Sequence, residues 1–190
     1  MQIQSTRFGT LDVSHSDMLL MPHGLIGFET CRHWVLLASD DNEEVAWLQS
    51  VALANVALPV ISPRRFLPNY RLHAHRRDLE ILQMRTRDQV FVLSIVSRNG
   101  TTLTTNLKSP IILNSTRRLA VQVVVTDEQP LAHPLALVDS HRIRAAAYSR
   151  LRKSGLTSQT RWEHVALLEM LRTLAGKPRV PPRKTSNGTG

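Results

Sequence analysis

The sequence predicts a mainly β protein, with a small antiparallel β-barrel-like domain followed by a C-terminal helical extension. Short apolar runs alternate with turn residues along the first 140 residues, as in antiparallel sandwiches and barrels. After about residue 138 the apolar period becomes helical, and the basic charge gathers there. We therefore divide the chain into a barrel domain at 1–137, a two-helix basic extension at 138–176 and a disordered tail at 177–190.

Length and composition favour a globular cytoplasmic protein. The 190 residues are enough to bury a core, and 42% of them are hydrophobic. No run approaches the roughly 18 uncharged apolar residues that a membrane span needs, and the first residues lack a secretory-signal pattern. Because Cys31 is the single cysteine, no intramolecular disulfide can form. We expect no membrane association and a cytoplasmic location.

Strand signals recur at short intervals through the first domain. The apolar, near-continuous run at 90–97 predicts a central strand covered on both faces, and Asn99-Gly100 after it predicts a two-residue hairpin turn. We expect strands near 2–6, 10–14, 17–21, 34–38, 45–51, 57–62, 90–97, 101–105, 110–114 and 118–126, and a short helix within 76–88.

The stretch from Thr104 to Val125 allows two interpretations, an active-site loop that holds Asn106 and Lys108 or a structural hairpin. Pro110 suits the first residue of a strand or an edge position, because proline has no amide hydrogen. In the last strand Leu119, Val121, Val123 and Val125 form one apolar face, whereas Gln122 and Thr126 point outward. These features favour the hairpin.

The C-terminal part carries helix signals. Thr160 and Glu163 form a capping box, and Gly176 and Pro178 end the helix. Leu168 and Leu171 lie on its apolar stripe, which has to be covered by the barrel, by the preceding helix or by a partner. That preceding helix runs from a cap at Asp139 or Ser140 to Gly155.

Charge is divided sharply along the chain. Residues 1–140 carry 13 Lys+Arg and 13 Asp+Glu, whereas residues 141–190 carry 11 and 2, so the net charge of +9 belongs to the second part. Such an asymmetry suits contact with an acidic protein face or with RNA, although a basic helix with a solvated face explains it as well.

Five segments in order resemble the flagellar assembly factor FliW family, over about residues 1–137. They are "MPHGLIGFE" (21–29), "WLQS" (47–50), "LPVISPRRFLPNY" (58–70), "TNLKSPIILN" (105–114) and "LAVQVVV" (119–125). The resemblance implies a non-enzymatic bacterial factor for flagellum biogenesis that binds flagellin. It also implies that the factor captures the RNA-binding regulator CsrA when flagellin is scarce. The extension from about 138 lies beyond the resemblance.

The residues offer no convergent catalytic or metal site. Cys31 and His33 lie two apart without a third group, which favours an ordinary thiol over a nucleophile and base. His73 and His75 could share a metal, but surface histidines fit the spacing better than a zinc site does. Gly24 and Gly27 suit turns at a barrel corner rather than a phosphate loop. We expect no cofactor and no small-molecule substrate.

Three groups of residues are candidates for partner contact. Exposed aromatic side chains beside arginines are typical of interaction hot spots, although those after the strand at 57–62 could instead cover the core. An acidic run at 39–44 suits a basic partner or a solvated turn. Trp47 is either a core residue or an anchor. The candidates are Arg64, Phe66, Pro68 and Tyr70, then Asp40, Asp41, Glu43 and Glu44, and finally Leu168 and Leu171.

Overall fold

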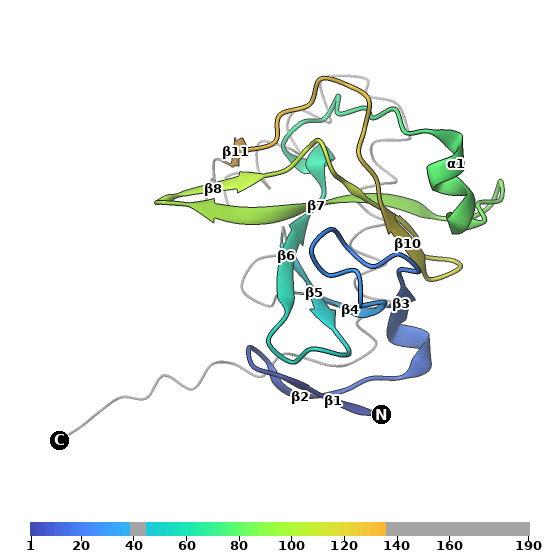
Figure 1. Ribbon diagram of the computed structural model, residues 1–190, viewed down its shortest axis with the longest axis vertical. Helices are drawn as coiled ribbons and strands as arrows, with labels where there is room; N and C mark the ends of the chain where they lie inside the picture. Colours follow the sequence, from blue (N-terminus) through green and yellow to red (C-terminus); the bar gives the residue numbers. More distant parts are fainter. Residues whose placement is uncertain (39–44, 136–190) are drawn as a thin grey trace, which may run out of the picture.

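The computed structural model describes residues 1–38 and 45–135, and within these ranges the chain is mainly β (Figure 1). The helical pieces are all short. Its strands are β1 (Gln2–Ser5), β2 (Gly9–Asp12), β3 (Met18–Leu20), β4 (His33–Ala38), β5 (Ala46–Ser50), β6 (Ala57–Ile61), β7 (Val90–Asn99), β8 (Thr102–Thr105), β9 (Ile111–Asn114), β10 (Leu119–Gln122) and β11 (His133–Leu135). The helical pieces are η1 (His15–Asp17), η2 (Pro63–Arg65), α1 (Arg76–Leu79) and η3 (Glu80–Leu82).

Seven strands close into a barrel, as the sequence predicted. Strands β3 to β7 pair in chain order and antiparallel, β7 pairs with β9, and β9 pairs with β10. The ring closes where β10 meets β3 in parallel, with Leu119 opposite Leu20. The barrel is therefore antiparallel except at this closing pair.

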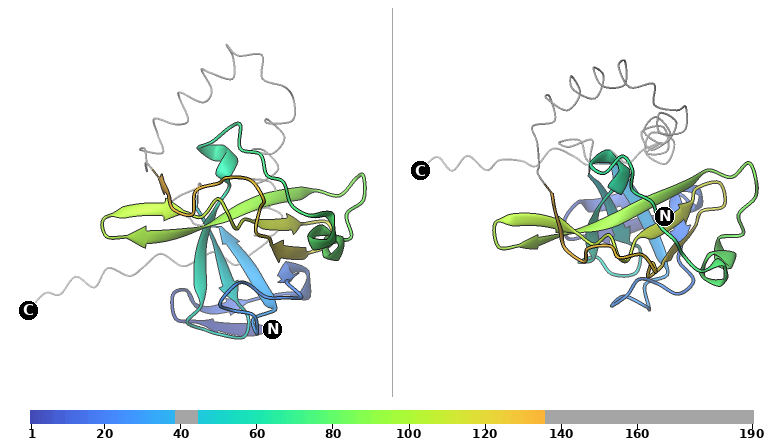
Figure 2. Two further views of the ribbon diagram at one scale, coloured as in Figure 1. Left: turned by 45° about the horizontal axis from the view of Figure 1, so that its top comes forward. Right: turned by 90° about the horizontal axis from the view of Figure 1, so that it is seen from above.

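Strand β7 is long enough to serve two sheets. Its first half, Val90 to Leu93, pairs with β9 in the barrel, and its second half, Val96 to Asn99, pairs with β8. Strand β11 then adds to the outer side of β8. The β7–β8 hairpin consequently projects beyond the barrel (Figure 2). Strand β7 is central but not fully covered, because Val90 is exposed and Val92 is half-buried.

The turn of this hairpin lies one residue later than the sequence suggested. Asn99 pairs with Thr102, so the two loop residues are Gly100 and Thr101 rather than Asn99 and Gly100. Of these two only Gly100 has a positive φ, +59°. A single positive φ at the first loop residue needs only one glycine, as in type II′ turns, and leaves Asn99 in the strand.

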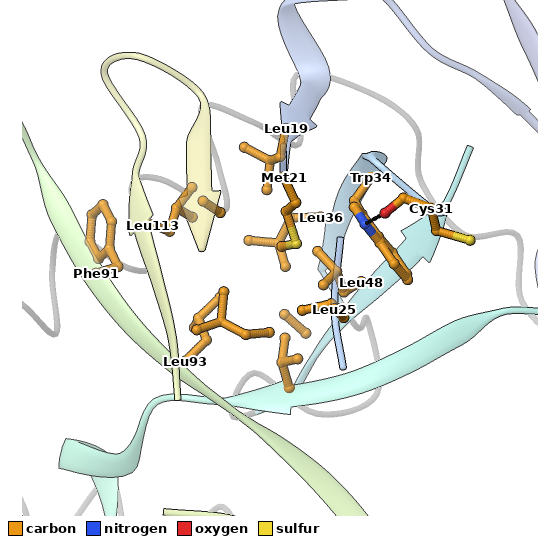
Figure 3. Close-up of a cluster of buried hydrophobic side chains, with 14 of the residues drawn as sticks. Leu19, Met21, Leu25, Cys31, Trp34, Leu36, Leu48, Phe91, Leu93 and Leu113 are labelled. Carbon is orange, nitrogen blue, oxygen red and sulfur yellow. Dashed lines mark hydrogen bonds between the residues drawn. The ribbon is translucent and has the colours of Figure 1, made fainter. Parts of the chain in front are cut away.

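The barrel interior is filled by side chains from all seven strands (Figure 3). Trp34 is completely buried there, and its indole N–H donates to the carbonyl of Cys31 at 2.8 Å. This bond satisfies the one polar atom of the largest core side chain. Cys31 itself is 1% exposed, so its thiol is a core group.

The outer face of β4 and β5 is covered as well. Along β4, Trp34 and Leu36 point into the barrel, whereas Val35 and Leu37 point outward. The β1–β2 hairpin packs on that outer face through a second cluster that includes Ile3, Phe8 and Leu11. Because both faces of β4 are buried from Trp34 onward, its residues 34–38 are all apolar instead of alternating, and only His33 at its start is polar and exposed.

The apolar face of β10 and the residues after it is the outside of the barrel, not its interior. Val121, Val123 and Val125 form a third cluster with Leu82, and the segment from Leu72 to Leu82 covers them. Ala120 on the other face joins the barrel core. Gln122 is therefore at the inner rim, where it donates to the carbonyl of Ser109 at 3.1 Å and accepts from the amide of Ile26 at 2.9 Å. The prediction that Gln122 points outward was wrong, since a helical segment covers the opposite face.

The helix expected within 76–88 is shorter than that range. α1 and η3 together occupy residues 76–82, and Gln83 then adopts a left-handed conformation with φ of 48°. The strand expected at 118–126 is also shorter than that range, because β10 ends at Gln122. β11, whose three residues include Pro134, was not predicted.

The segment after β3 turns sharply, as its glycines suggested. Gly24 and Gly27 have φ of +68° and +84°. At Gly24 a Cβ atom would lie 2.5 Å from the carbonyl oxygen of Phe28, so only glycine fits without a shift of backbone. Pro110 directly precedes β9, and β9 lies between β7 and β10 rather than at an edge.

Candidate partner-binding surface

The segment after β6 builds the best described candidate for partner contact. η2 begins at Pro63, where proline suits a first helical position. The amides of Phe66 and Leu67 bond back to the carbonyl of Pro63, and the amide of Tyr70 bonds to that of Leu67. These successive turns hold residues 63–70 compactly against the side of the barrel.

Phe66 is half-buried, and its ring stacks on that of His133 with centroids 5.7 Å apart and an angle of 21° between the planes. The stack joins η2 to β11, two elements far apart in sequence. Sequence reasoning did not find His133, because a three-residue strand containing proline gives no period-2 signal.

Tyr70 is not part of an exposed aromatic pair. It is 5% exposed, and its hydroxyl donates to the carbonyl of Leu107 at 2.9 Å. Burial raises the pKa of Tyr70 to about 12, with Asp127 adding to the rise and Arg64 opposing it. Of the two alternatives for Tyr70, an exposed contact residue or a ring that covers the core, the structure shows the second, and the hydroxyl satisfies the carbonyl of Leu107.

A shallow depression of about 450 Å³ lies beside this segment. Pro68 and Asn69 form part of its wall and are exposed, and His73 and Asp127 line it as well. The depression is open and has mixed polarity, which suits a surface contact better than an enclosed small-molecule site.

His73 is held by Asp127 through two bonds. The His73 backbone amide donates to one carboxylate oxygen and the ring Nδ1 to the other, both at 2.6 Å. The bond from the His73 ring lowers the pKa of Asp127.

Lys108 donates to the carbonyl of Asp127 at 3.0 Å, and Asn106 accepts from the amides of Lys108 and Ser109. Asn106 and Lys108 therefore organise backbone, as expected for a structural hairpin.

The histidines of the described residues form no metal site. His75 is the exposed residue before α1 and lies outside any cluster of ligand type. In the described parts of the chain no three His, Cys, Asp or Glu residues converge as a metal would require.

No helix in residues 1–38 or 45–135 is long and apolar enough to cross a membrane.

Trp47 packs on the outside of the barrel. It is half-buried in the cluster beneath the β1–β2 hairpin, edge-on to Phe8 at 5.8 Å. The guanidinium of Arg7 lies 3.7 Å above its ring. At this distance the guanidinium makes a cation–π contact with the ring face. Trp47 therefore belongs to the packing of the hairpin.

Two of the three candidate groups fall outside the described residues. They are the acidic run with Asp40, Asp41, Glu43 and Glu44, and the stripe with Leu168 and Leu171. Of the third group, Arg64 and Phe66 are half-buried, Pro68 is exposed and Tyr70 is buried.

Comparison with known proteins gives a consistent result. The family model described as "FliW protein" matches residues 2–135. The flagellar assembly factor FliW of Bdellovibrio bacteriovorus is 36% identical over 129 residues, which is 67% of this chain and 74% of that protein. The protein of the same name from Syntrophus aciditrophicus is 36% identical over 131 residues, covering 68% and 83% of the two chains. A crystal structure of the flagellar assembly factor FliW superposes with a TM-score of 0.65 at 26% identity, covering 73% of this chain and 98% of that one.

Proposed function

Because this chain belongs to the FliW family, we propose that it binds flagellin in the bacterial cytoplasm and captures a CsrA-type translational regulator when flagellin is scarce. The observation that carries the proposal is the family match over residues 2–135, whose described parts form the barrel and the β7–β8–β11 sheet. The family is one of non-enzymatic assembly factors. In this proposal the two partners compete for the protein. When flagellin is scarce, the protein is free to capture the regulator, and the repression of flagellin translation is lifted.

For flagellin we propose the surface around η2, formed by Arg64, Phe66 and Pro68. Phe66 is half-buried and its ring is held by the stack on His133, and an aromatic side chain already fixed in place loses little entropy on binding. Pro68 is exposed beside a shallow depression into which a partner side chain could fit. Tyr70 supports this surface from below through its bond to Leu107.

For the regulator we propose the acidic run with Asp40, Asp41, Glu43 and Glu44. An RNA-binding protein presents basic side chains, and opposite charge steers association and fixes the orientation of a complex. The Leu168 and Leu171 stripe is proposed as a further contact, either with the barrel or with a partner.

The direct test uses the full-length protein, purified flagellin and a purified CsrA-type regulator. We expect each to bind in titration calorimetry, and flagellin to displace the regulator from the complex. Failure to bind flagellin at any accessible concentration would refute the proposal, and simultaneous binding of both partners without any mutual effect would refute the switch.

Two variants locate the surfaces. Phe66→Ala should weaken flagellin binding by at least about tenfold, or about 1.4 kcal/mol, while Leu53→Ala, at a 42% exposed leucine elsewhere, serves as control. Glu43→Gln with Glu44→Gln should weaken only the regulator, with Glu80→Gln and Glu128→Gln as the control of equal charge. Loss of both partners in one variant, with an unchanged melting temperature, would mean that the two surfaces overlap.

RNA binding through the extension is the second candidate function, favoured by the net charge of +9 in residues 141–190. Such binding would rest on phosphate contacts and weaken steeply with salt. A salt-sensitive gel shift with RNA that is lost when the chain is truncated at 140 would support it. A shift retained after truncation would place RNA binding elsewhere.

A further inference from the structure

Two adjoining turns at one end of the barrel carry four arginines. The loop 83–89, between η3 and β7, contains Arg85 and Arg87, and the turn 115–118, between β9 and β10, contains Arg117 and Arg118. Both turns lie on the α1 side of the molecule (Figure 1).

Hydrogen bonds lock the two turns together. The amide of Gln89 donates to the hydroxyl of Thr116, and the amide of Ser115 donates to the carbonyl of Gln89, both at 3.0 Å. The arginines are thus displayed on one fixed backbone platform.

Only one of the four arginines is neutralised within this platform. The Nε of Arg117 lies 3.0 Å from the carboxylate of Asp88, and both side chains are largely buried. The same carboxylate oxygen also accepts from the side chain of Asn114 and from the backbone of Arg85. Asp88 therefore holds the junction together through this one oxygen, and Arg117 is the arginine of the two turns that it pairs with.

The other three arginines are exposed. In residues 1–38 and 45–135, the side chains of Arg85, Arg87 and Arg118 pair with no carboxylate. Three guanidinium groups on a rigid support create a local positive potential that favours an acidic ligand. The planar guanidinium also matches a carboxylate in two-point contact.

The apolar surroundings distinguish a protein ligand from a nucleic acid. Met84 and Val90, which flank the loop, are 45% and 36% exposed. Exposed Met among Arg is typical of the core of protein interfaces. Residues 83–90 and 114–118 contain no aromatic ring on which a base could stack.

We propose that this arginine surface, formed by Arg85, Arg87 and Arg118 with Met84 and Val90, binds an acidic amphipathic segment of a protein partner. It lies apart from the η2 surface and does not rest on the proposed binding of flagellin. Carboxylates of the partner pair with the three free guanidinium groups, and its apolar side chains cover Met84 and Val90.

The test measures binding of a labelled synthetic helical peptide, with Glu on one face and Leu on the other, to the full-length protein by fluorescence anisotropy. The test variant is Arg85→Gln, Arg87→Gln, Arg118→Gln. The matched control is Arg32→Gln, Arg71→Gln, Arg98→Gln, which removes the same charge from three other exposed positions. Both variants keep the basic extension, so its contribution to binding cancels in the comparison.

We expect the test variant to bind the peptide at least about tenfold more weakly, or about 1.4 kcal/mol, and the control to change by less than about threefold. Equal losses in the two variants would overturn the proposal, because net charge alone would then explain binding. If Arg118→Gln impairs folding, the pair Arg85→Gln, Arg87→Gln is compared with Arg71→Gln, Arg98→Gln.

A second comparison separates peptide from nucleic acid. Met84→Ser with Val90→Thr should weaken binding of the peptide and leave binding of oligouridine unchanged. If the arginine variant loses oligouridine but retains the peptide, the surface binds nucleic acid and the proposal is overturned.

Discussion

The side-chain amide of Asn114 donates a hydrogen bond of 2.8 Å to the carboxylate of Asp88, across 26 positions of the sequence. The same amide group also donates to the carbonyl of Leu82 at 2.9 Å, and Asn114 is completely buried. One side chain in β9 thereby ties together the end of η3, the loop before β7 and the β9–β10 turn. The conformation of the arginine surface depends on this junction.

Replacing Asn114 by alanine should destabilise the fold by about 1 to 3 kcal/mol, because it leaves the buried carbonyl of Leu82 without this partner. Denaturant unfolding measures the loss as a lower midpoint. Ser115→Ala, which removes a half-buried hydroxyl and its 3.2 Å bond to the carbonyl of Gln89 at the same junction, should cost less, about 0.5 kcal/mol. Equal midpoints for the two variants would show that the junction contributes little.

Asp88 should make stability depend on acid pH. The hydrogen bond from Asn114, followed by those from Arg85 and Arg117, lowers the pKa of Asp88 in the folded state. Since the folded pKa is depressed, the stabilisation is complete above the unfolded value of about 3.9 and disappears as pH falls through the folded pKa. In urea unfolding between pH 7 and pH 2, Asp88→Asn should lose less stability on acidification than the parent does. Parallel curves would contradict the assignment.

Gly24 should tolerate no side chain. Gly24→Ala adds a Cβ 2.5 Å from the carbonyl oxygen of Phe28 at a φ of +68°. Gly9→Ala is the matched control, because Gly9 has a φ of +76° but open space around it. The control should lose about 1 to 2 kcal/mol for the left-handed backbone, and Gly24→Ala should lose clearly more. Thermal melts of the two variants give the comparison, and similar losses would mean that the segment 24–29 yields easily.

Residues 1–137 should fold without the extension. All three described apolar clusters are formed by residues up to Val125, so truncation at 137 removes no member of them. We expect sheet-type circular dichroism and a single cooperative melt. A truncated chain that only aggregates would place the extension in the core.

The same truncation should leave flagellin affinity within a few-fold of the full chain, since the proposed η2 surface is retained. A loss of about 100-fold, or about 2.7 kcal/mol, would instead place the contact in residues 138–190. Leu168 and Leu171 would then be the first positions to change.

The sequence by itself determined the elements whose causes are local. Short apolar runs, some alternating and some continuous, located ten of the eleven strands in the described residues, and Gly24 and Gly27 marked the turns after β3. The ordered segments also indicated the family that the comparisons show. These features depend on a few neighbouring residues, and so they can be predicted from a single sequence.

Tertiary structure decided what covers each face. An apolar face on β10 is visible in the sequence, but only packing showed that α1 and η3 cover it and that it lies outside the barrel. Of the two orientations that the sequence left open for Tyr70, the fold has the buried one, in which the hydroxyl donates to the carbonyl of Leu107. The loop before β7 places Asp88 beside Asn114, which lies 26 positions away in the sequence. The parallel closure of β10 on β3 depends on the whole ring. Periodicity shows that a face must be buried, whereas its partner is chosen by long-range contacts that no local pattern encodes.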